Sequence, residues 1–413
     1  MMIVSLFILC GVVNYREVSK LHEVRNLHEE DFNYMREEVI ALGKLRNIPS
    51  LHYPKSQPKA RNPRRVYFDS VPYKGHTTRV FCWLGVPETK SAKVPAMVLV
   101  HGGGGNAFEH WVKRWNDIGY AAISIAVEGQ IKNEEGNNEQ FAGPARSGIY
   151  DDWRENLEDQ WMYHAVAATV LANNVLKSLP EIDDDHIGLM GISWGGVIAL
   201  NVGGIDPRFS FIISVYGTGS LTKAGNEYED KTKNNDMYKK VWDPDLYISN
   251  SHMPIYWLTW PTDIHFPLTC LAASYHAAAT SRDVGMQMLS IIPGLQHGHA
   301  AAWDPYHSYA FAQHMYTHKT PWLRQQGNLI VDNDKCIAKF SSDRNLDRAE
   351  LISTSDQGFV SSREWIQTMA VMIYSEEERL YKVFASIPSN TTGFFINIYS
   401  LDLVGSSLYM QIN

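Results

Sequence analysis

The chain has 413 residues, of which 45% are hydrophobic and 20% are charged, and its net charge is −8. This balance is typical of a globular protein and excludes a disordered or fibrous chain, while the length favours two domains. A net negative charge without a cluster of Lys and Arg also argues against nucleic acid as a partner.

The chain begins with an apolar run, MMIVSLFILCGVV, at residues 1–13. This run is too short to cross a bilayer as a helix, so we expect no stable membrane span. It resembles the apolar region of a signal peptide, although it lacks a positively charged start and a clear A-x-A cleavage site. We therefore predict a signal segment at residues 1–20 and a secreted or periplasmic protein. A mis-assigned start is the alternative.

Four cysteines are spread along the chain: Cys10, Cys82, Cys270 and Cys336. Their spacing matches neither a disulfide framework nor a metal site. Outside the apolar run, we interpret them as small buried apolar residues.

Residues 21–65 are predicted to form an N-terminal extension. They are rich in charged residues, His, Asn and Pro, and residues 16–45 predict one amphipathic helix. Two strand patterns follow at residues 66–71 and 78–86, with the turn signal Pro72-Tyr73-Lys74-Gly75 between them.

From residue 95 onward, apolar runs alternate with helical segments. Continuous apolar runs are typical of strands that are buried on both faces of a parallel sheet. The predicted strands are 95–100, 121–126, 186–190, 211–215, 254–258 and 286–292, and the predicted helices include 108–118 and 161–177. The alternation predicts an α/β fold, a doubly wound and mostly parallel sheet, over residues 66–320.

After residue 318 the pattern changes, with a linker at 321–328. The remaining strand candidates are short and show no helical period: 329–331, 366–374, 380–387, 394–399 and 407–412. We predict a small all-β, sandwich-like domain at residues 328–413. It could bind carbohydrate or cover a sheet edge.

One motif, Gly191-Ile192-Ser193-Trp194-Gly195-Gly196, links a predicted strand to a helical segment. The pattern G-x-S-x-G in this context predicts a nucleophile elbow, a sharp turn whose flanking positions must lack side chains. The backbone N–H of Trp194 would then lie under a developing oxyanion. An incidental serine in a glycine-rich turn is the alternative.

An activated serine needs a histidine that takes its proton and an acid that orients the histidine. In this fold the acid follows the serine in the chain and the histidine comes last. Asp263 is the acid in the loop after strand 254–258, and a helix N-cap is its alternative role. After strand 286–292, His297 is the predicted base and His299 the alternative.

A run of glycines, Gly102 to Gly105, follows His101 at the end of strand 95–100. Residues without side chains let backbone N–H groups approach a substrate oxygen, so Gly103 and Gly104 are predicted oxyanion donors beside Trp194. A phosphate-binding loop is disfavoured, because no G-K-[ST] follows. We predict no metal site. The run Asp183-Asp184-Asp185-His186 is interpreted as a polar loop that leads into the elbow strand.

Several motifs resemble a known group of enzymes: VHGGGGNAFEHW, GISWGG with GIDPRF and VYGTG, WDPDLYI, and LQHGHAAAW. Over residues 66–322 the chain resembles the α/β-hydrolase superfamily, on the branch of acetyl xylan esterases, dienelactone hydrolases and the catalytic domains of prolyl oligopeptidases. The tail, with Arg363-Glu364-Trp365 and Gly405-Ser406-Ser407, resembles a small C-terminal domain that some of these proteins carry.

The resemblance implies Ser193 as nucleophile, Asp263 as acid and His297 as base, without a cofactor. Two features differ from prolyl oligopeptidases, which have Tyr where this chain has Trp194 and a propeller for which there is no room before His101. We expect a serine esterase that acts on acyl esters, with acetylated polysaccharide as the candidate substrate. A prolyl oligopeptidase-type peptidase and a non-catalytic carbohydrate-binding or scaffold protein are the alternatives.

Overall fold

The computed structural model describes residues 27–55, 58, 61–88, 93–129, 141–279, 286–317 and 322–412. The predicted signal segment and Cys10 lie outside these residues. Of the helix predicted at 16–45, the described part is α1 (Glu29–Leu42). None of the helices in the described ranges combines the length and the apolar character that crossing a membrane requires.

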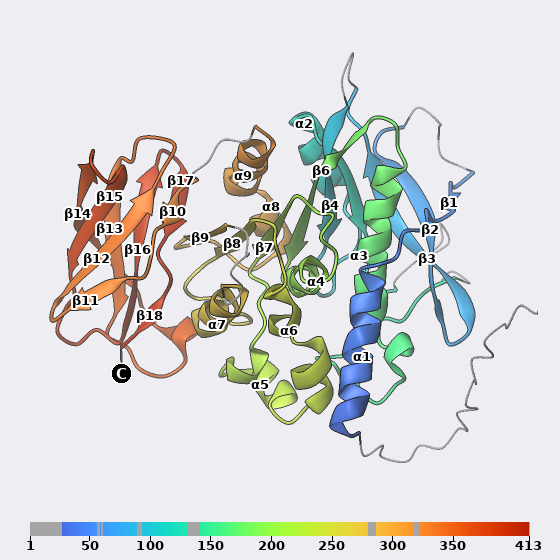
Figure 1. The fold of residues 1–413 in the computed structure, drawn as a ribbon, viewed down its shortest axis with the longest axis horizontal. Coiled ribbons are helices and arrows are strands. Elements are labelled where there is room, and N and C mark those ends of the chain that lie inside the picture. Colours follow the sequence, from blue (N-terminus) through green and yellow to red (C-terminus); the bar gives the residue numbers. More distant parts are fainter. Residues whose placement is uncertain are drawn as a thin grey trace, which may run out of the picture.

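A mostly parallel sheet forms the centre of the fold (Figure 1). Among the described residues its strands are β1 (Leu51–His52), β2 (Arg64–Tyr73), β3 (His76–Gly85), β4 (Val94–Val100), β5 (Ala121–Ile125), β6 (Ile182–Ile192), β7 (Phe211–Val215), β8 (Ile255–Thr259) and β9 (Gln287–Ile291). Their order is β1-β2-β3-β5-β4-β6-β7-β8-β9. The pairs from β5 to β9 are parallel, and β1, β2 and β3 extend the sheet antiparallel. The predicted doubly wound α/β fold is confirmed.

The elbow strand is longer than predicted, because β6 already begins at Ile182. The run from Asp183 to His186, predicted as a loop, therefore belongs to the strand. The pairing between β4 and β6 shifts register between Val94↔Ile182 and Ala96↔Ile187, and this irregularity accommodates the acidic residues.

Helices cover both faces of this sheet, as expected because its central strands are buried on both faces. The helices are α1, α2 (Glu109–Asp117), α3 (Trp161–Lys177), α4 (Trp194–Gly203), α5 (Glu227–Thr232), α6 (Asp245–Ile248), α7 (Leu268–Ala278), α8 (His299–Trp303) and α9 (Tyr306–Tyr316). Short helical turns are η1 (Leu157–Asp159), η2 (Leu221–Lys223), η3 (Tyr238–Trp242) and η4 (Val360–Ser362). One layer contains α2, α8 and α9, where Trp115 packs on Tyr309 with ring centroids 4.7 Å apart. The other contains α1, α3, α4 and α6.

The C-terminal strands form a second, antiparallel sheet, so the predicted all-β domain is confirmed. Its strands are β10 (Arg324–Gln325), β11 (Ile330–Asp332), β12 (Lys335–Ser341), β13 (Arg348–Thr354), β14 (Ile366–Ser375), β15 (Leu380–Ser386), β16 (Gly393–Ser400), β17 (Leu403–Ser406) and β18 (Met410–Gln411). The path β10-β12-β15-β14-β13-β16-β17 is continuous, with β11 on β12 and β18 on β16. The strands therefore form one sheet that curls into a near-barrel, instead of the two facing sheets of a sandwich (Figure 1).

The last predicted strand, 407–412, is not a single strand. Strand β18 covers only Met410–Gln411. Between β17 and β18, the hydroxyl of Ser407 accepts the N–H of Ile396 at 2.8 Å, and the N–H of Ser407 donates to the carbonyl of Ile396 at 2.7 Å. Figure 1 shows the second sheet beside the β9 end of the first sheet, next to α7 and α9.

Candidate active site

Ser193 lies on a strained turn between β6 and α4. Its backbone has φ 57° and ψ −119°, in a region that a residue with a side chain rarely adopts. The neighbouring glycines leave no space for a side chain. A Cβ at Gly191 would lie 2.0 Å from the carbonyl oxygen of Gly195, and a Cβ at Gly195 would lie 2.1 Å from the carbonyl oxygen of Val100. The turn therefore has the form of a nucleophile elbow.

The structure brings Ser193, His297 and Asp263 into one hydrogen-bonded series. Ser193 Oγ lies 3.0 Å from His297 Nε2, and His297 Nδ1 lies 2.8 Å from Asp263 Oδ2. The three residues follow β6, β9 and β8, whose carboxyl ends meet at one edge of the parallel sheet. This spacing is the one that proton transfer from a serine to a histidine requires.

The carboxylate of Asp263 is fully buried, and hydrogen bonds from its own loop offset the free-energy cost of burying it. Oδ1 accepts the backbone N–H groups of His265 (2.9 Å) and Phe266 (3.0 Å), and Oδ2 accepts Trp260 Nε1 at 3.1 Å. The alternative role as N-cap of α7 does not apply, since that helix has Pro267 as its N-cap. Instead, Oδ1 fixes the loop while Oδ2 faces His297.

Two aromatic rings hold the imidazole of His297, and sequence reasoning missed both of them. Tyr216 stacks on it with ring centroids 4.5 Å apart, and Phe266 lies nearly parallel at 6.2 Å. The Tyr216 hydroxyl donates to the carbonyl of Gln296 at 2.8 Å. Tyr216 follows β7 with φ 61°, so its place in the motif VYGTG, directly after a buried strand, was the available signal.

His299, the alternative base, faces the glycine loop. Its Nε2 accepts the N–H of Gly102 at 3.0 Å. This hydrogen bond requires a neutral ring, and burial lowers the pKa of His299 accordingly. The geometry thus places His297, and not His299, beside the hydroxyl of Ser193.

The glycine loop differs in one respect from the prediction. The N–H of Gly104 already donates to the buried carboxylate of Glu128, at 3.1 and 3.2 Å from its two oxygens. Glu128 also pairs with Arg146 Nε at 2.6 Å. Gly104 is therefore not a free donor in this arrangement. Within the described residues, the N–H groups of Gly103 and Trp194 have no acceptor.

His101 fixes the start of the glycine loop. It is fully buried, its Nε2 accepts the N–H of Val127 at 3.0 Å, and its Nδ1 lies 2.7 Å from the carbonyl oxygen of Gly102. Burial lowers the pKa of His101 to about 4, so the ring stays neutral near pH 7. A neutral ring can accept one hydrogen bond and donate the other, which is what these two contacts require.

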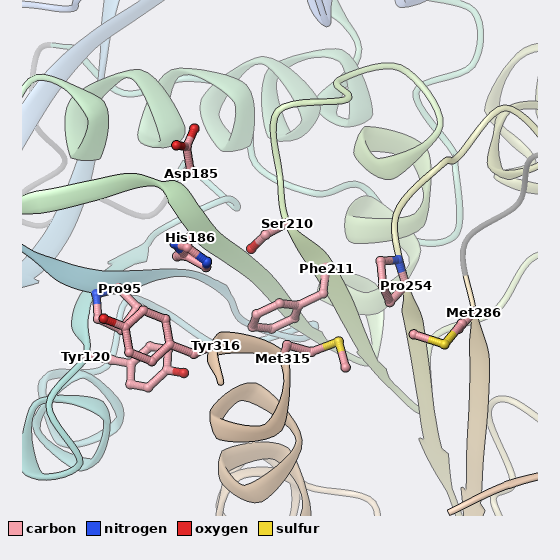
Figure 2. A pocket seen from close by; sticks show the side chains of 10 residues that line it. All are labelled: Pro95, Tyr120, Asp185, His186, Ser210, Phe211, Pro254, Met286, Met315 and Tyr316. Carbon is pink, nitrogen blue, oxygen red and sulfur yellow. The ribbon is translucent and has the colours of Figure 1, made fainter. Parts of the chain in front are cut away.

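A cavity of about 280 Å³ lies at the opposite edge of the sheet, near the amino ends of the strands (Figure 2). Its walls are mostly apolar, with Phe211 and Tyr316 among them, and its polar lining includes His186 and Ser210. Ser193 lies at the carboxyl ends, so this cavity does not belong to the candidate active site. In the described part of the chain, no three His, Cys, Asp or Glu side chains gather as metal ligands would.

A serine on a strand-to-helix elbow of a parallel sheet, with an Asp and a His after later strands, defines the α/β hydrolases as the class of this fold and site. The comparisons with known proteins agree with that class. The acetyl xylan esterase (AXE1) family model matches residues 16–220, just under half of the chain, so this segment is similar to that family. The matched segment contains Ser193 but ends before Asp263 and His297.

The names of the similar proteins refer to different activities. "Probable dipeptidyl-peptidase 5" from Aspergillus clavatus is 28% identical over 188 residues, which are 43% of this chain and 24% of that protein. "Acetyl esterase Axe7A" from Xylanibacter ruminicola is 26% identical over 157 residues, which are 36% of this chain and 35% of that protein. The chain thus spans about a quarter to a third of these relatives.

Among solved structures, acetyl xylan esterase 1 from Thermoanaerobacterium sp. JW/SL YS485 is similar with a TM-score of 0.55 at 18% identity. The match covers 70% of this chain and 94% of that one. At this identity it shows a shared fold.

Proposed function

We propose that this protein is a serine hydrolase that cleaves carboxylic esters, with Ser193 as nucleophile, His297 as general base and Asp263 as the orienting acid. The observation that supports it is the hydrogen-bonded series from Ser193 Oγ, through both ring nitrogens of His297, to the buried carboxylate of Asp263. A serine hydroxyl is a weak nucleophile alone, and a partner base of this kind activates it.

In the proposed reaction, Ser193 Oγ bonds to the ester carbonyl carbon while its proton passes to His297 Nε2. The negative oxygen of the tetrahedral intermediate accepts the N–H groups of Trp194 and Gly103, and Asp263 balances the charge of the imidazolium. The bond to the alcohol then breaks, and His297 returns the proton to the leaving oxygen. Water attacks the acyl-enzyme by the same route, which releases the acid and restores Ser193. Each group in this scheme belongs to the chain, so no cofactor is proposed.

The proposed substrate is an acetyl ester on a polysaccharide. The AXE1 match over residues 16–220 and the similarity to an acetyl esterase support this choice. A peptidase of the prolyl oligopeptidase type is the second candidate, and the similarity to a dipeptidyl-peptidase favours it. Amide hydrolysis would use the same serine and histidine, so the two functions differ in substrate and not in the reacting groups.

The deciding experiment compares acetate release from acetylated xylan and from a small acetyl ester with cleavage of a proline-containing peptide amide. Wild type and Ser193→Ala are assayed together. We expect ester cleavage without amide cleavage, and a kcat that falls roughly 10⁴–10⁶-fold in Ser193→Ala. Ester turnover that survives this substitution would refute the proposed nucleophile, and amide cleavage would favour the peptidase.

We also propose that the protein is secreted or periplasmic, on the basis of the apolar run at residues 1–13. Expression of the full chain with a C-terminal tag, followed by fractionation and N-terminal sequencing, tests this. Full-length protein in the cytoplasm alone would contradict it.

A further inference from the structure

In the loop that carries Asp263, residues 260–267, three successive backbone carbonyls accept hydrogen bonds from side chains outside the loop. We call this loop the acid loop. The carbonyl oxygen of Asp263 accepts a short hydrogen bond from the hydroxyl of Ser361, which lies in η4 of the C-terminal domain. The carbonyls of Ile264 and His265 accept the side-chain amide of Asn226, at 2.6 and 3.1 Å. The C-terminal domain is therefore in direct contact with the proposed catalytic acid.

Ser361 lies on a turn, residues 358–363, that is itself held in place. Arg363 is 7% exposed, and its Nη2 donates to the carbonyl of Gly358 at 2.8 Å. Arg363 Nη1 also lies 3.4 Å from the hydroxyl of Tyr409. A buried guanidinium that closes the two ends of the turn restricts its movement. Ser361 is thus presented to the acid loop from a rigid support.

A separate set of contacts fixes this domain against β9, the last strand of the first sheet. The N–H of Ile291 donates to Ser406 Oγ at 2.7 Å, and its carbonyl accepts the side-chain amide of Asn397 at 2.9 Å. Ser406 in turn donates to Asn397 Oδ1 at 2.6 Å. These side chains take the place of a neighbouring strand, so the edge of the sheet is covered.

We propose that the C-terminal domain positions the acid loop, with Ser361 as a positioning residue for Asp263. This inference rests on the hydrolase function proposed above. The carboxylate faces His297 only as long as the loop keeps its conformation, and the hydrogen bond from Ser361 holds the backbone of the same residue. Without the hydroxyl, a buried carbonyl loses its donor and the loop shifts to find another. A displacement of about 1 Å in such a site can cost on the order of 10²-fold in rate.

The test compares Ser361→Ala with Ser361→Thr, which keeps the hydroxyl, and with Ser406→Ala as the matched control. Ser361 and Ser406 are both buried, at 4% and 2% exposed, and both donate or accept across the contact between the domains. In the hydrolysis of a small acetyl ester, we expect kcat of Ser361→Ala to fall roughly 10- to 100-fold with KM within about twofold. Ser361→Thr should recover most of the loss, and Ser406→Ala should stay within about threefold of wild type.

Amide hydrogen exchange in the acid loop is a second measurement of the loop's stability, and it does not depend on the substrate. The amides of His265 and Phe266, which donate to Asp263, should exchange faster in Ser361→Ala than in Ser406→Ala. Equal kcat values or equal exchange in the two variants would overturn the positioning role. If wild type cleaves no ester, the proposed function fails while the exchange measurement still decides the inference. Ser361→Cys, a weaker donor of similar size, replaces Ser361→Ala if the latter does not fold.

Discussion

Acidification is expected to weaken the contact between α9 and β17, because His307 must remain neutral there. His307 is 6% exposed, and its Nε2 accepts the N–H of Val404 at 3.1 Å. Burial lowers the pKa of His307 to about 4, and the carboxylate of Asp402 opposes this only partly. A protonated ring could not accept that N–H, and its charge would be buried.

The folded pKa of about 4 lies below the ordinary value of about 6.5, so the unfolded chain binds the proton first on acidification. The stabilisation by neutral His307 is therefore complete above about pH 6.5 and is lost as the pH falls toward 4. For this shift, linkage gives a loss of about 2 kcal/mol between pH 8 and pH 5, and about 3 kcal/mol once the pH is below 4.

Urea unfolding of wild type and His307→Gln at pH 8 and pH 5 measures the contribution of His307 to the free energy of unfolding. Gln keeps an acceptor for the N–H of Val404 but does not titrate. We expect the variant to be less sensitive to acid by about 2 kcal/mol at pH 5. His101 and His164, whose pKa values burial also lowers to about 4, contribute equally to both proteins. An identical loss of stability in the two proteins would refute the assignment to His307.

Two further predictions concern the surroundings of Ser193 and His297. Glu128→Gln removes the negative charge that pairs with Arg146 and accepts the N–H of Gly104, so we expect the free energy of unfolding in urea to fall by about 2 kcal/mol. The side chain of Arg146 is 22% exposed, so the loss stays below the value for a fully buried pair. Unchanged stability would show that the pair contributes nothing. Tyr216→Phe keeps the ring on His297 and loses only the hydrogen bond to Gln296, so we expect a stability loss of about 1 kcal/mol and a kcat within about twofold in the ester assay. A large fall in kcat would mean that the hydroxyl itself acts in the reaction.

The sequence was sufficient to predict the parallel sheet and the place of Ser193, because both depend on short-range patterns. A strand buried on two faces is apolar along most of its length, so β4 appears as a continuous apolar run, and β5 and β7 appear as runs that each contain a single serine. The elbow needs a glycine two residues before the serine and another two residues after it, because a Cβ at Gly191 or Gly195 would collide with the backbone. Asp263 and His297 were expected near Ser193 because they follow later strands of the same sheet.

Other features depend on contacts between distant residues and have no local pattern. Glu128 was one acid among many in a polar loop until the fold placed it under Gly104. Ser361 reaches Asp263 across a separation of 98 residues. Strands β12 and β13, which were not predicted, contain charged residues such as Lys339 and Glu350, and their pairing with β15, β14 and β16 fixes their conformation.

The order of the strands explains why a second domain lies where it does. The proposed acid and base follow β8 and β9, the last two strands of the sheet, so both of their loops lie at an edge and not at its centre. An edge strand exposes unpaired N–H and C=O groups. Here Ser406 Oγ accepts the N–H of Ile291, and the amide of Asn397 donates to its carbonyl.

Two parts of the C-terminal domain therefore contact the first sheet and its loops: Ser406 in β17 covers the edge at β9, and Ser361 in the turn η4 contacts the backbone of Asp263. Strand β14, in the middle of this domain's sheet, exposes mainly aliphatic side chains, with Met369 70% and Val371 62% exposed, beside one exposed ring, Tyr374 at 43%. A surface for stacking sugar rings would expose several aromatic rings, whereas this strand exposes one. Of the two roles considered for this domain, the contacts favour coverage of the edge, and the separate contact from Ser361 adds support of the acid loop.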